Sequence, residues 1–493
     1  MGFKLLKKGF SWALPVLLIV FPLGGVFLSF PGTLSSLKTL FQQKDFLQAL
    51  ENSLIIGGFT SLLSSGLGIA MALFVSRLLL PYRRTMSLLL TIPLFFLPYQ
   101  FALGWSYLIP SRYSALLFSK TGVVFVLTGC FYPVVFWLVL SALSSVSREE
   151  EEAALLLTSP LRVLWKITLP RSRGGAITGA LLVFLLAFSE LGVPTYLGVN
   201  TVSYQVLVRF SAFYDMRAGL AASLPLLAVG MVILAVEYSL LRRGFRVFSP
   251  LKGGLRFSPG VFRIPILVFL VGSFSLFLLL PMGGLLHRAM EPKTFFRAVS
   301  AGGGSFLRTL FYSSVAAAVA VVWSVFSARK TSPLYSLILL LGFLTPQPAL
   351  ALGFMKVWGG LTLLYSTGIL LVMAMVARYY FLAFKVVELG YSHLDPSGEE
   401  AALLAGASPF TTFRRITVPS LKKWLGAAFL LVFVFSANDL GLGSMLYPPG
   451  GEPLVVRIYT LSVNNFPGVL SSLSLMNSLL GLMAVTFLLR RQS

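Results

Sequence analysis

The sequence has few of the side chains that many enzymes use. Among its 493 residues there are one cysteine, Cys130, and two histidines, His287 and His393. A single cysteine excludes an internal disulfide and a cysteine cluster for metal, and two distant histidines do not support a haem or zinc site. No G-x-x-x-x-G-K-[ST] sequence is present, so the chain has no loop of that type for ATP phosphates. We predict no enzyme, no metal site and no cofactor bound by this chain.

Charged residues are also scarce. They make up 11% of the chain, whereas soluble proteins carry about 25%. Hydrophobic residues reach 57% and the mean hydropathy is +0.87. This composition predicts an integral membrane protein in contact with lipid. The net charge of +23 would indicate a nucleic-acid partner in a soluble protein. In a membrane protein the basic residues can instead set the orientation of the helices, so we predict no nucleic-acid partner.

Apolar runs long enough to cross a bilayer recur along the whole chain. They predict an all-α membrane protein with about twelve transmembrane helices, several of them interrupted by prolines, which membrane helices tolerate. The first run follows three lysines as a signal peptide would, but it has no clear A-x-A cleavage site and is predicted to be a retained helix. The runs cover residues 10–30, 53–76, 86–109, 121–143, 174–198, 219–241, 264–286, 309–328, 334–358, 362–384, 425–447 and 469–489.

The basic residues predict the orientation of these helices. With the N-terminus inside, about 27 of the 39 basic residues lie on the cytoplasmic side, as the positive-inside rule requires. Both termini and the loop at 385–424 are then cytoplasmic. Glu237 and Arg378 lie near the ends of spans, and their charged side chains are expected to extend to the membrane surface. The run Gly302-Gly303-Gly304 is expected to form a flexible external loop.

The chain repeats itself at a fixed distance. Ser159-Pro160 matches Ser408-Pro409, and Ile167 and Pro170 match Ile416 and Pro419, each at an offset of 249 residues. Two parallel six-helix halves related by an axis along the membrane normal are predicted. We place a first repeat at 1–241, a cytoplasmic linker at 242–263 and a second repeat at 264–493.

One polar loop in each half carries a distinctive pattern. In the second half it is Glu400-Ala401-Ala402, then Gly406, and then Ile416 and Pro419. Glu399 and Glu400 should favour the positive end of a helix dipole, and the following alanines and leucines offer a small apolar surface. Gly406 permits a turn that residues with a Cβ resist. In the first half the corresponding residues are Glu151, Glu152, Ala153 and Ala154, but Leu157 or Thr158 stands in place of the glycine.

This pattern resembles the cytoplasmic coupling loop of ABC importer permeases, with Val418 where leucine is usual. The resemblance implies the type I ABC importer permease fold in the cell inner membrane. It implies docking of two ABC ATPase subunits, expected to be a homodimer that holds ATP and Mg, and delivery of substrate by an external or periplasmic solute-binding protein. Glu400 is then expected to contact the ATPase. A twelve-helix secondary transporter is the alternative from another class, but it does not explain two such loops at a fixed offset.

Two carboxylates follow the loops at matching positions. Glu190 and Asp439 lie within apolar runs, each is followed by Leu-Gly, and they are also 249 residues apart. Carboxylates at membrane depth are costly and mark ion pathways or paired charges. The pair is expected either to line the translocation pathway or to form salt bridges or helix caps. Arg209 and Arg457, expected in external loops, could contact the substrate, the binding protein or lipid headgroups.

The region around Asp439 suggests a substrate. It runs through Tyr447-Pro448-Pro449-Gly450 to Val456-Arg457-Ile458-Tyr459 and is similar to ferric-iron permeases, with thiamine permeases as relatives. Asp439 stands where those permeases usually carry glutamate. The resemblance implies import of ferric iron by alternating access. Importers of thiamine, or of phosphorylated and other organic anions, share much of the pattern and remain open as alternatives.

Overall fold

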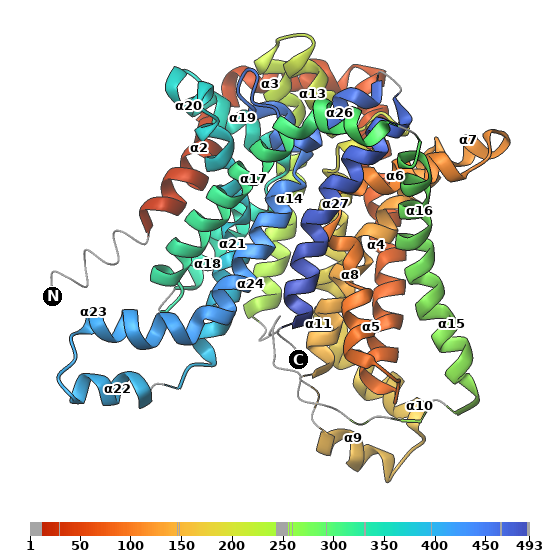
Figure 1. The fold of residues 1–493 in the computed structure, drawn as a ribbon, viewed down its shortest axis with the longest axis vertical. Coiled ribbons are helices and arrows are strands. Elements are labelled where there is room, and N and C mark those ends of the chain that lie inside the picture. The colour runs from red at the N-terminus through yellow and green to blue at the C-terminus, as the bar shows by residue number, and fades with distance from the viewer. Residues whose placement is uncertain are drawn as a thin grey trace.

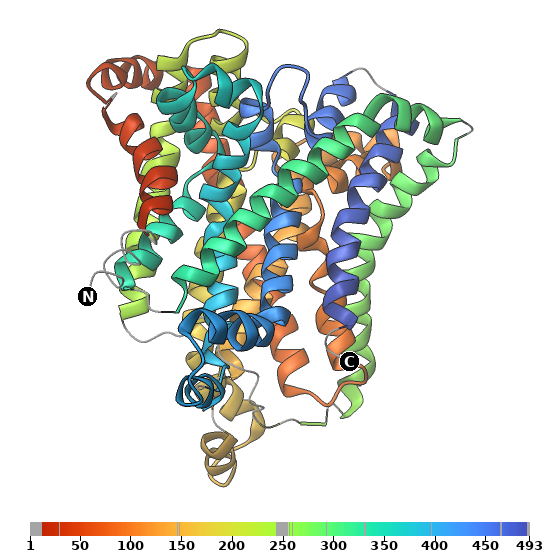
Figure 2. The same cartoon turned by 60° about the vertical axis from the view of Figure 1, so that its left-hand side comes forward.

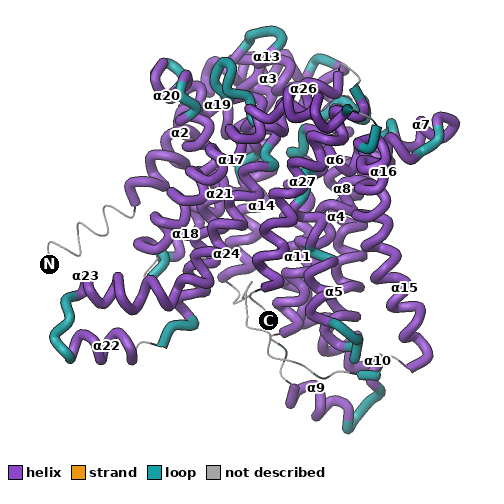
Figure 3. The backbone as a smooth tube through the Cα atoms, in the orientation of Figure 1, coloured by secondary structure: helices purple, strands orange, loops and turns teal. Residues whose placement is uncertain are grey.

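The computed structural model describes residues 12–28, 30–144, 146, 148–242, 255, 257–258, 260–291, 293–329, 332–395, 397–463 and 466–490. Throughout this described part the chain is helical (Figure 3), and its β-structure is confined to an isolated bridge between Leu78 and Phe257. The all-α prediction is therefore confirmed. The predicted linker at 242–263 lies largely outside the described residues, so the repeat boundaries stay a prediction.

The two halves contain equivalent membrane helices in the same order (Figure 1), although their shorter segments differ. The first half comprises η1 (Val16–Val20), α2 (Phe21–Leu28), α3 (Phe30–Phe41), α4 (Lys44–Arg77), α5 (Arg83–Leu89), η2 (Ile92–Phe95), α6 (Pro98–Leu108), η3 (Ser111–Tyr113), α7 (Ser114–Leu117), α8 (Lys120–Ser144), α9 (Arg148–Leu155), α10 (Pro160–Val163), η4 (Leu164–Thr168), α11 (Leu169–Phe188), α12 (Gly192–Tyr196), α13 (Val202–Ser211) and α14 (Met216–Arg242). The second comprises η5 (Gly260–Phe262), α15 (Arg263–Phe274), η6 (Ser275–Leu279), α16 (Leu280–Ala289), α17 (Thr294–Ser327), α18 (Pro333–Leu344), α19 (Gln347–Trp358), α20 (Thr362–Ser366), α21 (Ile369–Ser392), α22 (Ser397–Leu404), α23 (Pro409–Thr412), η7 (Phe413–Thr417), α24 (Val418–Ala437), α25 (Leu440–Leu446), α26 (Leu454–Val463) and α27 (Pro467–Arg490). Equivalent helices match in length: α4 and α17 each have 34 residues, and α11 and α24 each have 20.

Each predicted apolar run coincides with a helix or a bent helix pair. Among the described residues, 8 helices are long and apolar enough to cross a membrane. Two further pairs are bent, by 92° between α5–η2 and α6 and by 103° between α18 and α19. Two shorter apolar helices cover the first and last runs. The count of twelve spans therefore stays a prediction, although the position of every run is matched.

Two expected spans end early. The runs at 174–198 and 425–447 were each expected to form one helix, but α11 ends at Phe188 and α24 ends at Ala437. The short helices α12 and α25 then begin with new N-caps. The glycine run at 302–304 is also different from the expectation, because it lies inside α17 and not in a loop. Gly302 is buried against Leu473 of α27, and this packing overrides the low helix propensity of glycine.

Four π-helical turns precede four prolines. The turns η1, η4, η6 and η7 each end two residues before Pro22, Pro170, Pro281 or Pro419. Proline has no N–H to donate to the carbonyl four residues earlier. The residue before it bonds instead to the carbonyl five residues earlier, as Leu169 does to Leu164 and Val418 to Phe413. The prolines thus widen the first and fifth spans of each half at equivalent places.

The first span of each half packs against the other half. The segment η1–α2 contacts α18, α19 and α21, whereas η6–α16 contacts α8 and α6. Glycines permit the close packing of each first span against the other half. A Cβ on Gly353 of α19 would lie 2.8 Å from the carbonyl oxygen of Pro22. A Cβ on Gly104 of α6 would lie 2.1 Å from the carbonyl oxygen of Pro281. The two glycines are 249 residues apart, so both halves use the same contact.

This contact can be tested with two neighbouring glycines of α16. A Cβ on Gly284 would lie 2.5 Å from the carbonyl oxygen of Gly104, whereas a Cβ on Gly283 meets nothing within 4 Å. Gly284→Ala is expected to destabilise the protein by about 1–3 kcal/mol through overpacking. Gly283→Ala should be neutral or stabilising, because alanine favours a helix by about 1 kcal/mol. Thermal midpoints in detergent measure the difference, and equal midpoints would contradict the contact.

Candidate functional site

The predicted coupling loops form helices that project from one end of the molecule. In Figures 1 and 2, α9 and α22 both lie beyond the lower ends of the membrane helices. We call this the coupling end. Glu151, Glu152, Ala153 and Ala154 lie on α9, and Glu400, Ala401 and Ala402 lie on α22. The helices predicted for these motifs are therefore present.

The two helices end in different turns. After α22, Gly406 has φ +84°, and its N–H donates to the carbonyl of Leu403 while the N–H of Ala407 donates to that of Ala402. These two bonds define a Schellman motif, which glycine favours because the left-handed conformation strains other residues. After α9, Leu157 and Thr158 both donate to the carbonyl of Ala154 without a positive φ. The missing glycine thus changes the turn but keeps the helix.

Leucines where both helices end are open to solvent: Leu156 and Leu157 directly follow α9, and Leu404 is the last residue of α22. The exposed fractions are 88% for Leu156, 88% for Leu157 and 89% for Leu404. Ala153 and Ala401 are exposed beside them. Large apolar side chains gathered at a projecting surface mark an interaction site. Neither helix covers its leucines with another part of the described chain, so each offers a small apolar docking surface.

A glutamate just before each Glu-Ala-Ala motif points inward. Glu151 is buried, and its Oε1 lies 3.0 Å from Nη2 of Arg77 and accepts a hydrogen bond of 2.9 Å from Oγ1 of Thr168. Glu399 repeats this arrangement with Arg329 and accepts a hydrogen bond of 2.6 Å from Oγ1 of Thr417.

From the sequence, Glu399 was expected to interact with the helix dipole and Glu151 to belong to the coupling motif, and no internal partner was predicted for either. The sequence contained a signal for this arrangement. The x residue of the I-x-L-P and I-x-V-P motifs is threonine in both halves. Each of these threonines pairs with the glutamate 17 or 18 residues before it. Each loop therefore contains an inward glutamate next to an outward one: Glu152 is exposed and pairs only with Arg148 of its own helix, at 2.6 Å, and Glu400 is exposed.

The half-buried carboxylate Glu190 and the buried carboxylate Asp439 cap the short helices that follow the fifth spans. Glu190 accepts hydrogen bonds from the N–H groups of Gly192, at 3.1 Å, and Val193, at 2.8 Å. Asp439 accepts a bond of 2.8 Å from the N–H of Leu442. Both therefore satisfy the free N–H groups at a helix N-terminus. Helix capping is one of the two roles expected for this pair from the sequence. The other role, in the translocation pathway, stays a prediction.

The two caps have different neighbours. Asp439 accepts a bond of 2.6 Å from the hydroxyl of Tyr379, and its Oδ2 lies 3.8 Å from Nε of Arg378. The equivalent residues in the first half, 249 positions earlier, are Gly129 and Cys130. A Cβ on Gly129 would lie 2.2 Å from the ring of Phe277, so a phenyl ring occupies the space next to that backbone.

Three arginine or glutamate side chains differ from the expectation. Arg378 is buried and donates to the carbonyl of Thr345, and Glu237 is buried and accepts a bond of 3.2 Å from Thr178. Neither extends to the surface, because polar partners on neighbouring segments hold them inside. Arg209 lies on α13, not in a loop, and is buried with bonds to Gln43 and Gln205.

Arg457 also lies on a helix. It belongs to α26, where its Nη1 is 3.1 Å from Oε1 of Glu452 and its Nε donates to the carbonyl of Ala301 at 2.9 Å. The expectation of a loop position was wrong for both arginines. Their roles toward substrate or binding protein stay predictions.

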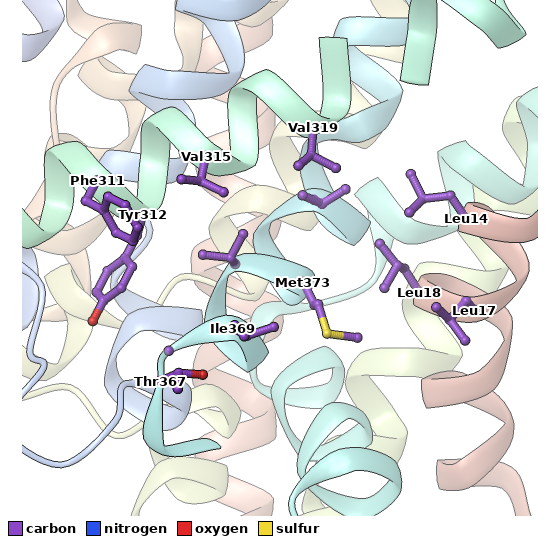
Figure 4. A pocket seen from close by; sticks show the side chains of 13 residues that line it. Leu14, Leu17, Leu18, Phe311, Tyr312, Val315, Val319, Thr367, Ile369 and Met373 are labelled. Carbon is purple, nitrogen blue, oxygen red and sulfur yellow. The ribbon is translucent and has the colours of Figure 1, made fainter. Parts of the chain in front are cut away.

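An apolar cavity of about 380 Å³ lies away from these groups. Figure 4 shows Leu14 and Leu18 of the first span facing Val319 of α17 and Met373 of α21, with Thr367 at one end. Its lining contains no aspartate, glutamate, lysine, arginine or histidine, and its polar side chains are Tyr312 and Thr367. Among the residues that the structure describes, no three histidine, cysteine, aspartate or glutamate side chains are grouped as ligands for a metal ion.

Comparison with known proteins gives the class. Residues 64–279 match the family described as binding-protein-dependent transport system inner membrane component. Together with the helical fold and the coupling helices, this match identifies residues 64–279 as a domain of the ABC importer permease type within a multi-pass membrane protein. The secondary-transporter alternative is thereby set aside.

Individual relatives are named for the transport of particular substrates. A protein of Haemophilus influenzae named for ferric transport is 22% identical over 473 residues, which cover 85% of this chain and 73% of the relative. A ferric transport system permease of Actinobacillus pleuropneumoniae is 22% identical over 78% of this chain and 63% of its own length. A permease of Salmonella typhimurium named for 2-aminoethylphosphonate transport is 28% identical, over 41% of this chain and 78% of the relative.

The unequal caps predict unequal effects of neutralisation. Asp439→Asn leaves the buried Arg378 without its counter-charge, and removing one partner of a buried pair costs about 3–5 kcal/mol. Glu190→Gln removes no arginine pair and is expected to cost about 1–3 kcal/mol, through one lost acceptor. Thermal midpoints should therefore fall further for Asp439→Asn. Adding Arg378→Leu to Asp439→Asn should restore part of the loss; a larger fall for Glu190→Gln would refute this account of the caps.

Proposed function

We propose that this permease forms the membrane pathway of an ATP-driven importer whose two ATPase subunits dock on α9 and α22. The observation that carries the proposal is the pair of projecting helices at one end of the molecule, one from each half, with exposed leucines where each helix ends. Two equivalent docking helices suit a homodimer of ATPase subunits. An external or periplasmic solute-binding protein delivers the substrate to the opposite end.

The ATPase subunits bind ATP and Mg, and this chain converts their movement into alternating access. ATP binding must favour one state of the permease through contacts that differ between states, because tight binding alone shifts no equilibrium. The coupling end is proposed to be cytoplasmic, in keeping with the basic residues there, and to place both termini in the cytoplasm. Exposed Glu400 is proposed to form a charged contact with the ATPase.

Ferric iron is the proposed substrate. Support comes from the ferric permeases, whose similarity extends over 78% and 85% of this chain and so includes both halves. Glu190 is the more suitable pathway carboxylate, since Asp439 already faces Arg378. A Cβ on Gly192 would lie 2.9 Å from Leu440, which places the Glu190 cap where the short helices of the two halves meet.

An organophosphonate is the second candidate. The 2-aminoethylphosphonate permease has the higher identity, 28%, although over 41% of the chain. Binding-protein-dependent uptake into proteoliposomes separates the two, with labelled ferric iron and labelled 2-aminoethylphosphonate as competing substrates. Uptake of the phosphonate alone would overturn the proposal of iron and leave the docking proposal intact.

Docking can be tested by cross-linking. The single native Cys130 is buried and can be replaced by alanine, so that new cysteines react alone. Ala153→Cys and Ala401→Cys are each expected to capture an ATPase subunit, because both positions are exposed on the docking helices. Ala115→Cys is the control, since it is exposed on α7 at the opposite end (Figure 1). Capture from only one of the two docking positions would contradict a two-subunit assembly.

A further inference from the structure

The same three residue types meet at the base of each coupling helix. We call Arg77, Glu151 and Thr168 the first triad, and Arg329, Glu399 and Thr417 the second triad. In each, a carboxylate on the coupling helix receives an arginine and a threonine hydroxyl at the same time. The threonines are 249 residues apart, as the repeat requires, whereas the arginines are 252 apart, so Arg329 reaches the glutamate from a position that is not the exact equivalent of Arg77.

The members of a triad come from three different elements. Arg77 is the last residue of α4, and Arg329 follows the end of its equivalent, α17. Thr168 and Thr417 are the last residues of the π-turns that lead into α11 and α24. The glutamate therefore joins the coupling helix to two membrane helices of its own half.

The coupling helices have few other ties to the membrane helices. Their main packing partners are short neighbouring segments: α10 for α9, and α23 and the π-turn η7, which leads into α24, for α22; Glu150 of α9 also pairs with Arg171 of α11 at 3.0 Å. A short helix held in this way could tilt without moving the rest of the protein. The link from Glu399 to Arg329 and Thr417 prevents such tilting, because it fixes one end of α22 to both α17 and α24.

We propose that each triad is a positioning clamp that transmits movement of the docked ATPase from the coupling helix to the second and fifth spans of its half. The inference rests on the proposed docking of the ATPase at α9 and α22. The triad residues are positioning residues: their polar groups bond to one another within the permease, whereas the exposed leucines and Glu400 are available to meet the ATPase. Loss of a clamp should separate docking from transport.

The first clamp is more strongly enclosed than the second. Arg77 and Glu151 are 4% and 1% exposed, whereas Arg329 and Glu399 are 51% and 15% exposed. Oε2 of Glu151 also accepts a bond of 2.8 Å from the N–H of Leu255, and Phe257 bonds to the main chain of Arg77 and Leu79. The chain between the halves is thus attached to the first clamp. Because the second clamp is accessible, its variants are expected to fold, and it is the one to test.

The test uses the complete importer in proteoliposomes and measures transport, ATP hydrolysis and ATPase docking for each variant. Glu399→Arg and Arg329→Glu are each expected to reduce transport per ATP hydrolysed roughly tenfold or more, since coupling free energies of this size are usual. Both should retain docking, measured by cross-linking from Ala401→Cys. The double swap, Arg329→Glu with Glu399→Arg, restores the opposite charges and should recover transport. Thr417→Val, which removes only the hydroxyl, should reduce transport per ATP to a smaller extent.

Glu388→Gln is the matched control. It breaks an ion pair between Lys385 and Glu388 that lies within α21 and joins no second element, so transport per ATP should not change. Normal coupling in both single charge variants would overturn the clamp. The clamp would also be overturned if both single charge variants lost docking or thermal stability and the double swap did not restore it. The triad would then be only structural. An unsubstituted permease that captures no ATPase would instead overturn the proposed function on which the clamp rests.

Discussion

The carboxylate at the start of each coupling helix constrains the whole coupling end. Glu151 is buried against Arg77, and leaving either charge without its partner would cost about 3–5 kcal/mol. The pair therefore holds α9 in one orientation for as long as the protein stays folded. Its geometry depends on the π-turn before Pro170, which places the hydroxyl of Thr168 on the same carboxylate oxygen. This contact sets the position of the coupling helix relative to the fifth span, and with it the surface offered for docking.

Around that shared frame the halves differ in their polar chemistry. The first half has an enclosed clamp, a turn without glycine and a cap, Glu190, that accepts only main-chain N–H groups. The second half has an accessible clamp, the Gly406 turn and a cap, Asp439, that faces Arg378 and Tyr379. Repeats that keep their backbone frame but diverge in side chains can perform different parts of one cycle. Such differences make each half a natural control for the other.

The sequence predicted the features that depend on local pattern. Hydrophobic runs located the spans, and the repeated motifs located both coupling helices and the paired caps. It failed where distant contacts decide the outcome. Arg378 is near a span end in the sequence, yet Asp439, 61 residues later, holds it inside. The glycines at 302–304 predict a loop, but Leu473 packs against Gly302 and the segment is helical. The partners Arg77 and Glu151 are 74 residues apart, so no local pattern could pair them.

The central claim is that each coupling helix moves as one body with its own half. Distances between spin labels, measured with and without ATP in the assembled importer, test it most directly. Labels at exposed Ala405, directly after α22, and at exposed Val322 on α17 report movement within the second half. Labels at Ala405 and at exposed Glu149 on α9 report movement between the halves. The account predicts that ATP changes the distance from Ala405 to Glu149 and leaves the distance from Ala405 to Val322 unchanged. A change from Ala405 to Val322 as large as that between the halves would show that the coupling helix swings independently and would contradict the account.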